Sequence, residues 1–209
     1  MIRKAELKDK KEITKLHYMA GSNLMEYFFA CDDEKLYTIL DLLYESTETI
    51  FSKEYFFLFE ENDKVKGAIS LYQGNLKKLL EKNIGKYGKE ISRVAGFLRL
   101  LKMMLRSSLN KAIPNFYDDE LYIQAISVFS EYRGQSIASK LLKHSFEYAK
   151  KLNIPKVALI VEIQNEHALN IYKKLGFKIV STHKFKRKYK KYKLTGIHKM
   201  IAKVQLHLN

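Results

Sequence analysis

A short glycine-containing loop is the part of this sequence best suited to chemistry. Its residues are Tyr132-Arg133-Gly134-Gln135-Ser136-Ile137-Ala138-Ser139, between an apolar run over 121–129 and a helix-like run that extends to about residue 152. A helix that starts after such a turn presents free backbone N–H groups and the positive end of its dipole, and Arg133 adds a full charge. The order strand, basic glycine turn, helix therefore predicts a site for the phosphate groups of a cofactor.

Two other phosphate-binding motifs do not fit this loop. A P-loop requires Gly-Lys-Ser/Thr after its glycines, which is absent here. A dinucleotide fingerprint requires three glycines, and this loop has only Gly134. An Arg-Gly turn before a helix also occurs as a purely structural feature, so the identity of the cofactor depends on the residues that follow.

A second motif lies downstream, after the helix-like run and a buried strand. It reads Asn165-x-x-Ala168-x-x-x-Tyr172-x-x-x-Gly176-Phe177. Together with the first loop, this arrangement resembles the GCN5-related N-acetyltransferase (GNAT) family over about residues 118–182. The family motif Gln/Arg-x-x-Gly-x-Gly/Ala corresponds here to 133–138, with Ser136 in place of the glycine. We expect this serine to cost little if its φ is negative, while its side chain could crowd or hydrogen-bond a phosphate.

The resemblance implies that acetyl-CoA is the cosubstrate, with its pyrophosphate on the backbone N–H groups of the loop. The implied phosphate-binding residues are Arg133, Gly134, Gln135, Ser136, Ile137, Ala138 and Ser139. It also implies that pantetheine runs along Ile126-Ser127-Val128, where the strand splays at a bulge, and that the Val128 N–H stabilises the oxyanion. Asn165 matches the family asparagine that bonds pantetheine, and its alternative role is the N-cap of a helix.

Tyr172 matches the family tyrosine near the thioester sulfur, where a phenol can protonate or hydrogen-bond the departing thiolate. Its alternative role is a packing residue of the helix.

Glu120 is a candidate general base because some family members carry a glutamate at this place. Strand alternation predicts Glu120, Tyr122, Gln124 and Ile126 on one face. Glu120 could also be a solvated residue, Glu162 is a second candidate, and a water chain could replace both.

The pattern of elements predicts a mixed α/β fold with a central twisted sheet, the architecture of GNAT acyl-CoA N-acyltransferases, in one domain over 1–209. We expect a hairpin over 55–72, strands over 121–128, 157–161 and 177–182, and a last strand that reaches Leu208. The main helices are expected over 9–19, 24–29, 36–50, 136–152 and 165–175. The segment 75–115 is predicted to be a helical insertion that forms a lid or binding wall, with a core helix or a homodimer face as alternatives.

Composition limits the remaining possibilities. The chain has 209 residues with 46% hydrophobic residues and a net charge of +15. The single cysteine, Cys31, excludes an internal disulfide, and we expect a cytoplasmic protein with no signal peptide and no membrane span. The histidines show no metal-ligand spacing, so no metal is expected. The basic run Lys184–Lys193, with Tyr189 and Tyr192, is compatible with nucleic-acid binding but more typical of a solvated surface.

The sequence therefore predicts an N-acetyltransferase that moves an acetyl group from acetyl-CoA directly to a primary amine in a ternary complex. The alternatives are a CoA-binding regulator with weak or no catalysis, and a basic nucleic-acid-binding module. The acceptor remains open among peptides, polyamines, amino sugars and small amines. Positive net charge disfavours polycations unless Asp118, Asp119 and Glu120 form an acidic pocket.

Overall fold

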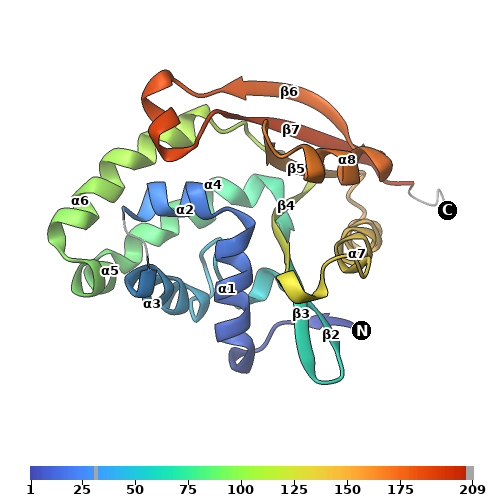
Figure 1. Cartoon of the computed structure of the whole chain (residues 1–209), viewed down its shortest axis with the longest axis horizontal. Coiled ribbons are helices and arrows are strands. Elements are labelled where there is room, and N and C mark those ends of the chain that lie inside the picture. The colour runs from blue at the N-terminus through green and yellow to red at the C-terminus, as the bar shows by residue number, and fades with distance from the viewer. Residues whose placement is uncertain (31–32, 206–209) are drawn as a thin grey trace.

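A seven-stranded sheet forms the centre of the computed structural model, which describes residues 1–30 and 33–205. Its strand order is β1-β2-β3-β4-β5-β7-β6, and neighbouring strands are antiparallel except β4 and β5 (Figure 1). The strands are β1 (Ile2–Lys4), β2 (Phe56–Glu61), β3 (Lys64–Gln73), β4 (Glu120–Val128), β5 (Lys156–Glu162), β6 (Lys178–Lys184) and β7 (Gly196–Lys203). The predicted mixed α/β fold with a central sheet is confirmed.

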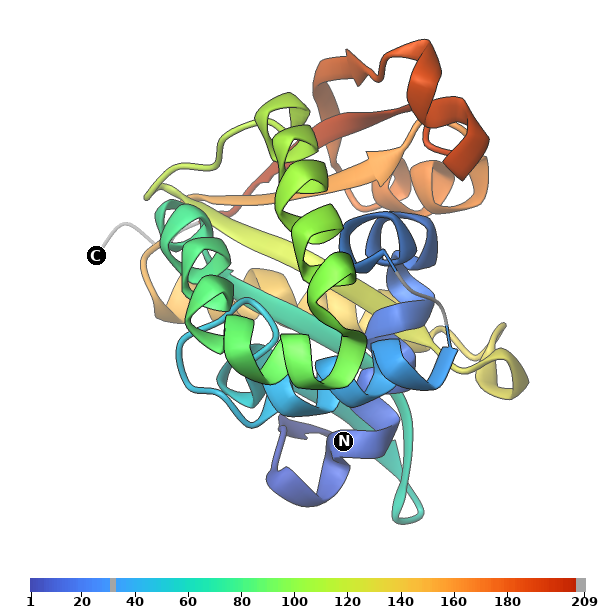
Figure 2. The same ribbon diagram turned by 90° about the vertical axis from the view of Figure 1, so that its left-hand side faces the viewer.

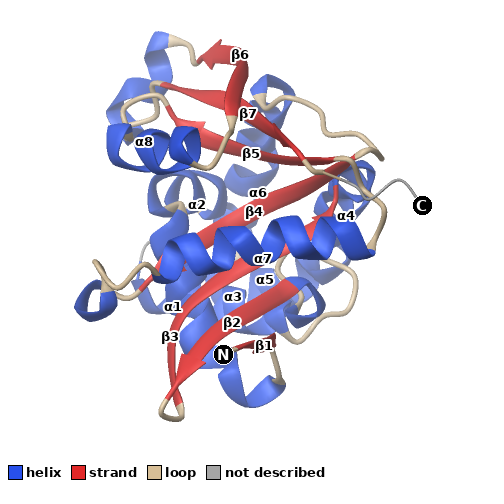
Figure 3. Cartoon of the chain, turned by 90° about the vertical axis from the view of Figure 1, so that its right-hand side faces the viewer, coloured by secondary structure: helices blue, strands red, loops and turns tan. Residues whose placement is uncertain are grey.

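Helices cover both faces of the sheet. α7 and α8 pack on one face, while α1 to α6 lie on the other (Figures 1 and 3). The helices are α1 (Lys10–Ala20), α2 (Ser22–Phe29), α3 (Asp33–Tyr44), α4 (Lys77–Asn83), α5 (Gly88–Ala95), α6 (Phe97–Arg106), α7 (Ile137–Lys151) and α8 (Glu166–Lys174). Aliphatic strand residues such as Leu121 and Val157 bury against α7, which explains why the central strands are almost continuously apolar.

The predicted hairpin is confirmed, and its turn has the expected chemistry. β2 ends at Glu61 and β3 begins at Lys64, so the connection is the pair Asn62-Asp63. Both residues have positive φ, 53° and 56°. Asn and Asp tolerate this left-handed conformation, which matches the twist of a two-residue hairpin.

The helix predicted over 36–50 is shorter than expected, because α3 ends at Tyr44. Hydroxyl groups replace the helical hydrogen bonds in the following segment. Ser46 Oγ donates to the Leu43 carbonyl at 2.5 Å and contacts Thr49 Oγ1 at 2.8 Å, while Thr49 N–H donates to Ser52 Oγ at 2.9 Å. Serine and threonine side chains that bond nearby backbone groups compete with the helix, which ends it here.

The last strand also ends earlier than expected. β7 finishes at Lys203, although Val204 remains buried. The predicted extension through Leu206 and Leu208 lies outside the described residues, as does Cys31.

The segment between β3 and β4 is a helical insertion, as predicted. It contains α4, α5 and α6 and lies across the sheet (Figure 2). A short 3-10 turn over Ile84–Tyr87 joins α4 to α5, and another over Ser107–Ala112 follows α6. Gly96, with φ of 89°, separates α5 from α6. α6 is not a core helix, because Leu98 and Leu105 on its outer side are 73% and 76% exposed. The homodimer face therefore remains a prediction for this outer side.

Candidate active site

The central pair of parallel strands separates at one end of the sheet. β4 and β5 pair only from Glu120↔Lys156 to Ile123↔Leu159, although β4 continues to Val128 and β5 to Glu162. The two strands consequently diverge and leave a wedge between them (Figure 3). Beyond Ile123 and Leu159, the backbone N–H and C=O groups with which β4 and β5 would otherwise pair face this wedge.

A bulge in β4 accompanies the separation. The register with β3 shifts so that Ser70 faces Ala125 while Leu71 faces Ile123, which leaves Gln124 as the extra residue. The bulge therefore lies at Gln124 rather than at 126–128, and it reverses the expected alternation. Gln124 and Ala125 both line the cavity described below, whereas Ile126 packs on the opposite face with the α7 core. The expectation that Gln124 and Ile126 share a face is thus wrong.

Beyond the bulge, alternate N–H groups of β4 point into the wedge. The Phe129 N–H donates to the Lys66 carbonyl at 3.0 Å, so Val128 and Gly67 form a non-hydrogen-bonded pair. The Val128 N–H, and the Ile126 N–H two residues earlier, are directed away from β3. This is the direction in which an extended ligand could add as a pseudo-strand, while Ser127 bonds toward β3.

The predicted phosphate loop follows β4 at the mouth of the wedge. A 3-10 turn over Ser130–Tyr132 leads to four exposed residues, and α7 begins at Ile137. Ser136 occupies the N-cap position without a side-chain hydrogen bond to the helix, so the first N–H groups of α7, at 137–139, have no cap from it. N–H groups at a helix N-terminus without a side-chain cap, with Arg133 close in sequence, favour an anionic ligand. The exposed loop residues are Arg133, Gly134, Gln135 and Ser136.

Ser136 does not have the negative φ under which we expected a serine to fit easily. Its φ is 58° and its ψ is 17°, in the left-handed region. Gly134 adopts positive φ as well, at 80°. A residue with a Cβ is disfavoured in this conformation by about 1 kcal/mol or more, which explains why glycine suits the position. The loop reaches the turn geometry with a strained serine.

Asn165 and Tyr172 extend from the other side of the wedge, where α8 begins. The Asn165 Oδ1 accepts the Ala168 N–H at 3.1 Å, so its oxygen serves as the N-cap while its amide N–H groups remain donors. Tyr172 is 9% exposed and packs near Phe177, with ring centroids 5.8 Å apart. Burial raises the pKa of Tyr172 to about 12, which keeps the phenol protonated at neutral pH. Both residues line the cavity.

Glu120 lies at the other end of β4, where the two strands are still paired. It is 2% exposed, and both of its carboxylate oxygens accept from Lys199 Nζ at 2.9 and 2.8 Å. It also accepts the Tyr117 N–H at 3.2 Å, and Lys199 donates to the Asn115 carbonyl. A carboxylate in a buried ion pair of this kind supports the structure, and Glu120 lies at the end of β4 away from the wedge, so we do not propose it as the base. Its neighbour Asp119 pairs with Lys156.

Glu162, the second candidate base, lies at the end of β5 and lines the cavity. Its side chain is half-buried, and burial raises the pKa of its carboxyl. Hydrogen bonds from Asn23 and Gln164 act in the opposite direction, with Gln164 Nε2 at 2.9 Å. A carboxylate that lines a cavity and whose pKa is raised by partial burial is suited to act as a general base.

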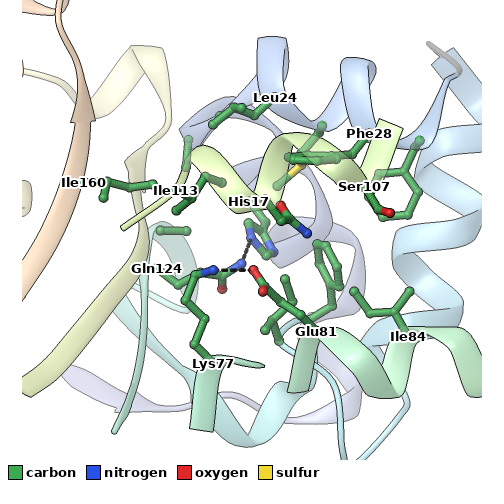
Figure 4. Close-up of a pocket in the computed structure, with 18 of the residues that line it drawn as sticks. His17, Leu24, Phe28, Lys77, Glu81, Ile84, Ser107, Ile113, Gln124 and Ile160 are labelled. Carbon is green, nitrogen blue, oxygen red and sulfur yellow. Dashed lines mark hydrogen bonds and ion pairs between the residues drawn. The ribbon is translucent and has the colours of Figure 1, made fainter. Parts of the chain in front are cut away.

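A cavity of about 970 Å³ opens from the wedge beneath α2, α5 and α6 (Figure 4). Its walls are mostly apolar, and one group of polar side chains lies near β4 and α4. The His17 Nε2 lies 3.1 Å from Gln124 Nε2, and Lys77 Nζ donates to Glu81 at 2.6 Å. Complete burial lowers the pKa of His17 to about 3, so this ring is neutral at physiological pH and is a poor base.

Sequence reasoning missed His17, Gln124 and the Lys77–Glu81 pair. α1 and α4 reach the sheet only in the folded chain, so no local motif marks their side chains. One signal was present in the sequence, because Gln124 is a polar residue within an otherwise apolar strand. The side chains of Tyr72 and Gln124 each retain one buried polar atom without a partner among the described residues.

The basic run near the C-terminus folds back on the molecule. A 3-10 turn over Arg187–Tyr192 buries Tyr189 against Tyr27, with ring centroids 5.6 Å apart. Arg106 lies over the ring of Tyr192 at 5.1 Å. The tyrosines that could have stacked on nucleic-acid bases are therefore engaged within the protein. The lysines of this run remain a solvated surface.

Residues 1–30 and 33–205 contain neither a metal-binding cluster nor a membrane-spanning helix. No group of three or more His, Cys, Asp or Glu residues in this range is arranged to hold a metal ion. None of the helices described there combines the length and apolar character needed to cross a bilayer.

A splayed parallel pair flanked by a helix N-terminus is the framework of acyl-CoA N-acyltransferases. The acetyltransferase (GNAT) family model matches residues 18–177. An N-acetyltransferase structure from Staphylococcus aureus Mu50 superimposes with a TM-score of 0.74 at 27% identity, covering 97% of this chain and 100% of that chain. The chain belongs to the GNAT acetyltransferase family, as its motifs predict.

Curated relatives match over shorter stretches. N-alpha-acetyltransferase 30 from Schizosaccharomyces pombe is 37% identical over 71 residues, which is 34% of this chain and 44% of the relative. Spermidine N(1)-acetyltransferase from Escherichia coli is 40% identical over 55 residues, 26% of this chain and 30% of the relative. The chain thus matches less than half the length of these relatives, and they act on acceptors of different chemistry.

Proposed function

We propose that the protein transfers an acetyl group from acetyl-CoA to a primary amine in a ternary complex. The observation that carries this proposal is the wedge between β4 and β5, with the exposed α7 N-terminus at its mouth and Tyr172 beside it. The loop N–H groups and Arg133 bind the pyrophosphate, and the pantetheine arm adds along 126–128. The Asn165 amide N–H groups bond the same arm from α8.

The proposed chemistry uses groups on both sides of the wedge. The amine nitrogen attacks the thioester carbon, a C–N bond forms, and the C–S bond breaks. Glu162 takes the proton that the attacking ammonium must lose, directly or through a water, and the Val128 N–H stabilises the oxyanion. Tyr172 donates a hydrogen bond to the departing sulfur, and its raised pKa favours this over full proton transfer. The nitrogen loses a second proton as the C–S bond breaks, and that proton reaches the thiolate through solvent, while Glu162 releases the first proton to solvent.

Titration calorimetry with acetyl-CoA and with CoA tests the first half of this proposal. We expect a 1:1 complex, and substitution of Arg133 by Ala weakens it because one phosphate-binding charge is lost. Absence of binding at hundreds of micromolar would refute the proposal. A coupled assay for free thiol, run over a panel of amines, tests the second half.

One feature favours a second function, a CoA-binding regulator without efficient catalysis. Ser136 places a hydroxymethyl group in the left-handed N-cap position of α7, next to the phosphate site. Tight CoA binding without amide formation over the whole amine panel would support this alternative. We retain a cytoplasmic location as a prediction, which fractionation of cells that express the protein would test.

A further inference from the structure

The charges that line the cavity distinguish between classes of acceptor. This inference rests on the proposed acetyl transfer and concerns the amine that accepts the acetyl group. Among the described lining residues, the carboxylates are Glu81 and Glu162. Glu81 is neutralised by Lys77 at 2.6 Å, in a pair whose side chains are 21% and 10% exposed. Glu162 is thus the carboxylate that remains to compensate an incoming ammonium group.

The described part of the cavity lining offers no such compensation for a second or third cation. Lys78 and Lys82, both exposed, belong to its lining, and His17 is neutral. An ammonium group taken from water into an apolar site is strongly disfavoured unless it is paired. A polyamine would leave its additional charges unpaired and close to these lysines. The acidic residues at 118–120 are not among the residues that line the cavity, and Glu120 and Asp119 already pair with Lys199 and Lys156.

The side chains that line the cavity, by contrast, can accommodate an acceptor that is apolar apart from its ammonium group. α2 contributes Leu24 and Phe28, and Ile113 and Ile160 close the side nearest the sheet (Figure 4). Methionine side chains such as Met103 adapt to ligands of irregular shape. A volume of about 970 Å³ is at the upper end of the range for small-molecule sites, so space remains beyond what the acyl end of a thioester occupies.

We propose that the acceptor is a primary amine with one positive charge and a large apolar body, held between α2, the insertion and the sheet. The ammonium group lies toward Glu162 and the wedge, and the apolar body contacts Phe28 and Met103. Such chemistry is found both in free arylalkylamines and at the N-terminus of a peptide whose first side chain is apolar. This acceptor differs from the substrate named for the spermidine-acetylating relative.

The test compares three probes with the full chain: 2-phenylethylamine, a tripeptide with an N-terminal leucine, and spermidine. Initial rates with acetyl-CoA give kcat/KM, and calorimetry on the CoA-saturated protein gives affinity without turnover. We expect an apolar monoamine to exceed spermidine by about tenfold or more in both measurements. The monoamine with the higher kcat/KM shows whether the acceptor is a free arylalkylamine or the N-terminus of a peptide. Preference for spermidine in binding overturns the inference, whereas binding without any amide formation overturns the proposed function instead.

A matched pair of substitutions on α6 makes the test specific to the cavity. Met103 lines the cavity, while Leu105 on the same helix is exposed on the outer side. Met103→Glu should lower kcat/KM for the preferred monoamine by about tenfold and reduce the ratio of that value to the value for spermidine, because it adds to Glu162 a second carboxylate without a lysine partner. Leu105→Glu makes a similar chemical change outside the cavity and should leave the ratio unchanged. Equal effects of the two substitutions, with CoA affinity retained, would contradict the proposed placement.

Discussion

The buried histidine of α1 offers the sharpest test of the structure. His17 is 4% exposed, packs against Phe51 and Phe56 at centroid distances of 5.0 and 5.1 Å, and lies 3.1 Å from the Gln124 amide. Burial lowers the pKa of His17 from 6.5 to about 3. Because the unfolded chain binds this proton and the folded chain does not, acidification favours unfolding.

The size of this effect follows from proton linkage. The contribution of His17 is fully present above about pH 6.5 and is lost progressively as the pH falls toward 3. Between pH 7 and pH 5, the protein should lose about 2 kcal/mol of unfolding free energy through this residue alone. That is a considerable part of the roughly 5–15 kcal/mol that stabilises a typical domain.

The assay is urea denaturation at pH 7, 6 and 5 for the wild type and for His17→Gln. Glutamine does not titrate, so the variant should be less sensitive to acidification, with a pH 7-to-5 loss smaller by about 2 kcal/mol. The comparison uses the change with pH, because the substitution itself can alter stability. His167→Gln, at an exposed position on α8, is the control and should follow the wild-type curve. Parallel curves for the wild type and His17→Gln would refute the buried, neutral histidine.

Three further predictions concern the predicted site residues. Tyr172→Phe should lower kcat by about tenfold or more with little change in KM, because the lost hydrogen bond acts on the departing sulfur; equal effects on kcat and KM would contradict this role. Ser136→Gly should raise the unfolding free energy by about 1 kcal/mol, since it relieves the left-handed serine, and calorimetry should show CoA affinity retained or increased. Glu120→Gln should lower the free energy of unfolding, measured by urea denaturation, by about 3 kcal/mol, because it leaves Lys199 buried and unpaired. Asp119→Asn, which breaks a more exposed pair, should lower it by less than about 1 kcal/mol. A stable Glu120→Gln protein whose kcat is selectively lost would instead support the general-base role.

Local patterns in the sequence were enough for the sheet and for the turn that precedes α7. The alternation of apolar residues, the Asn62-Asp63 turn and Gly176 after α8 depend on near neighbours, so their conformations could be read from the chain. The loop before α7 is similarly local, because a helix N-terminus presents its N–H groups whatever lies around it. The exception is Ser136, whose positive φ is set by the turn geometry rather than by its own preference.

The acceptor side was decided by tertiary structure. The bulge at Gln124 depends on pairing with β3, and one extra residue is enough to move Ile126 to the other face. The sequence indicated Glu120 as a candidate base, and it could not indicate that Lys199, from a distant strand, pairs with this carboxylate in the folded chain. Sequence alone determined the fold, the family and the position of the turn before α7. The neutral His17 and the neutralised Glu81 arise from contacts between segments far apart in the chain, because burial and charge pairing exist only once those segments meet.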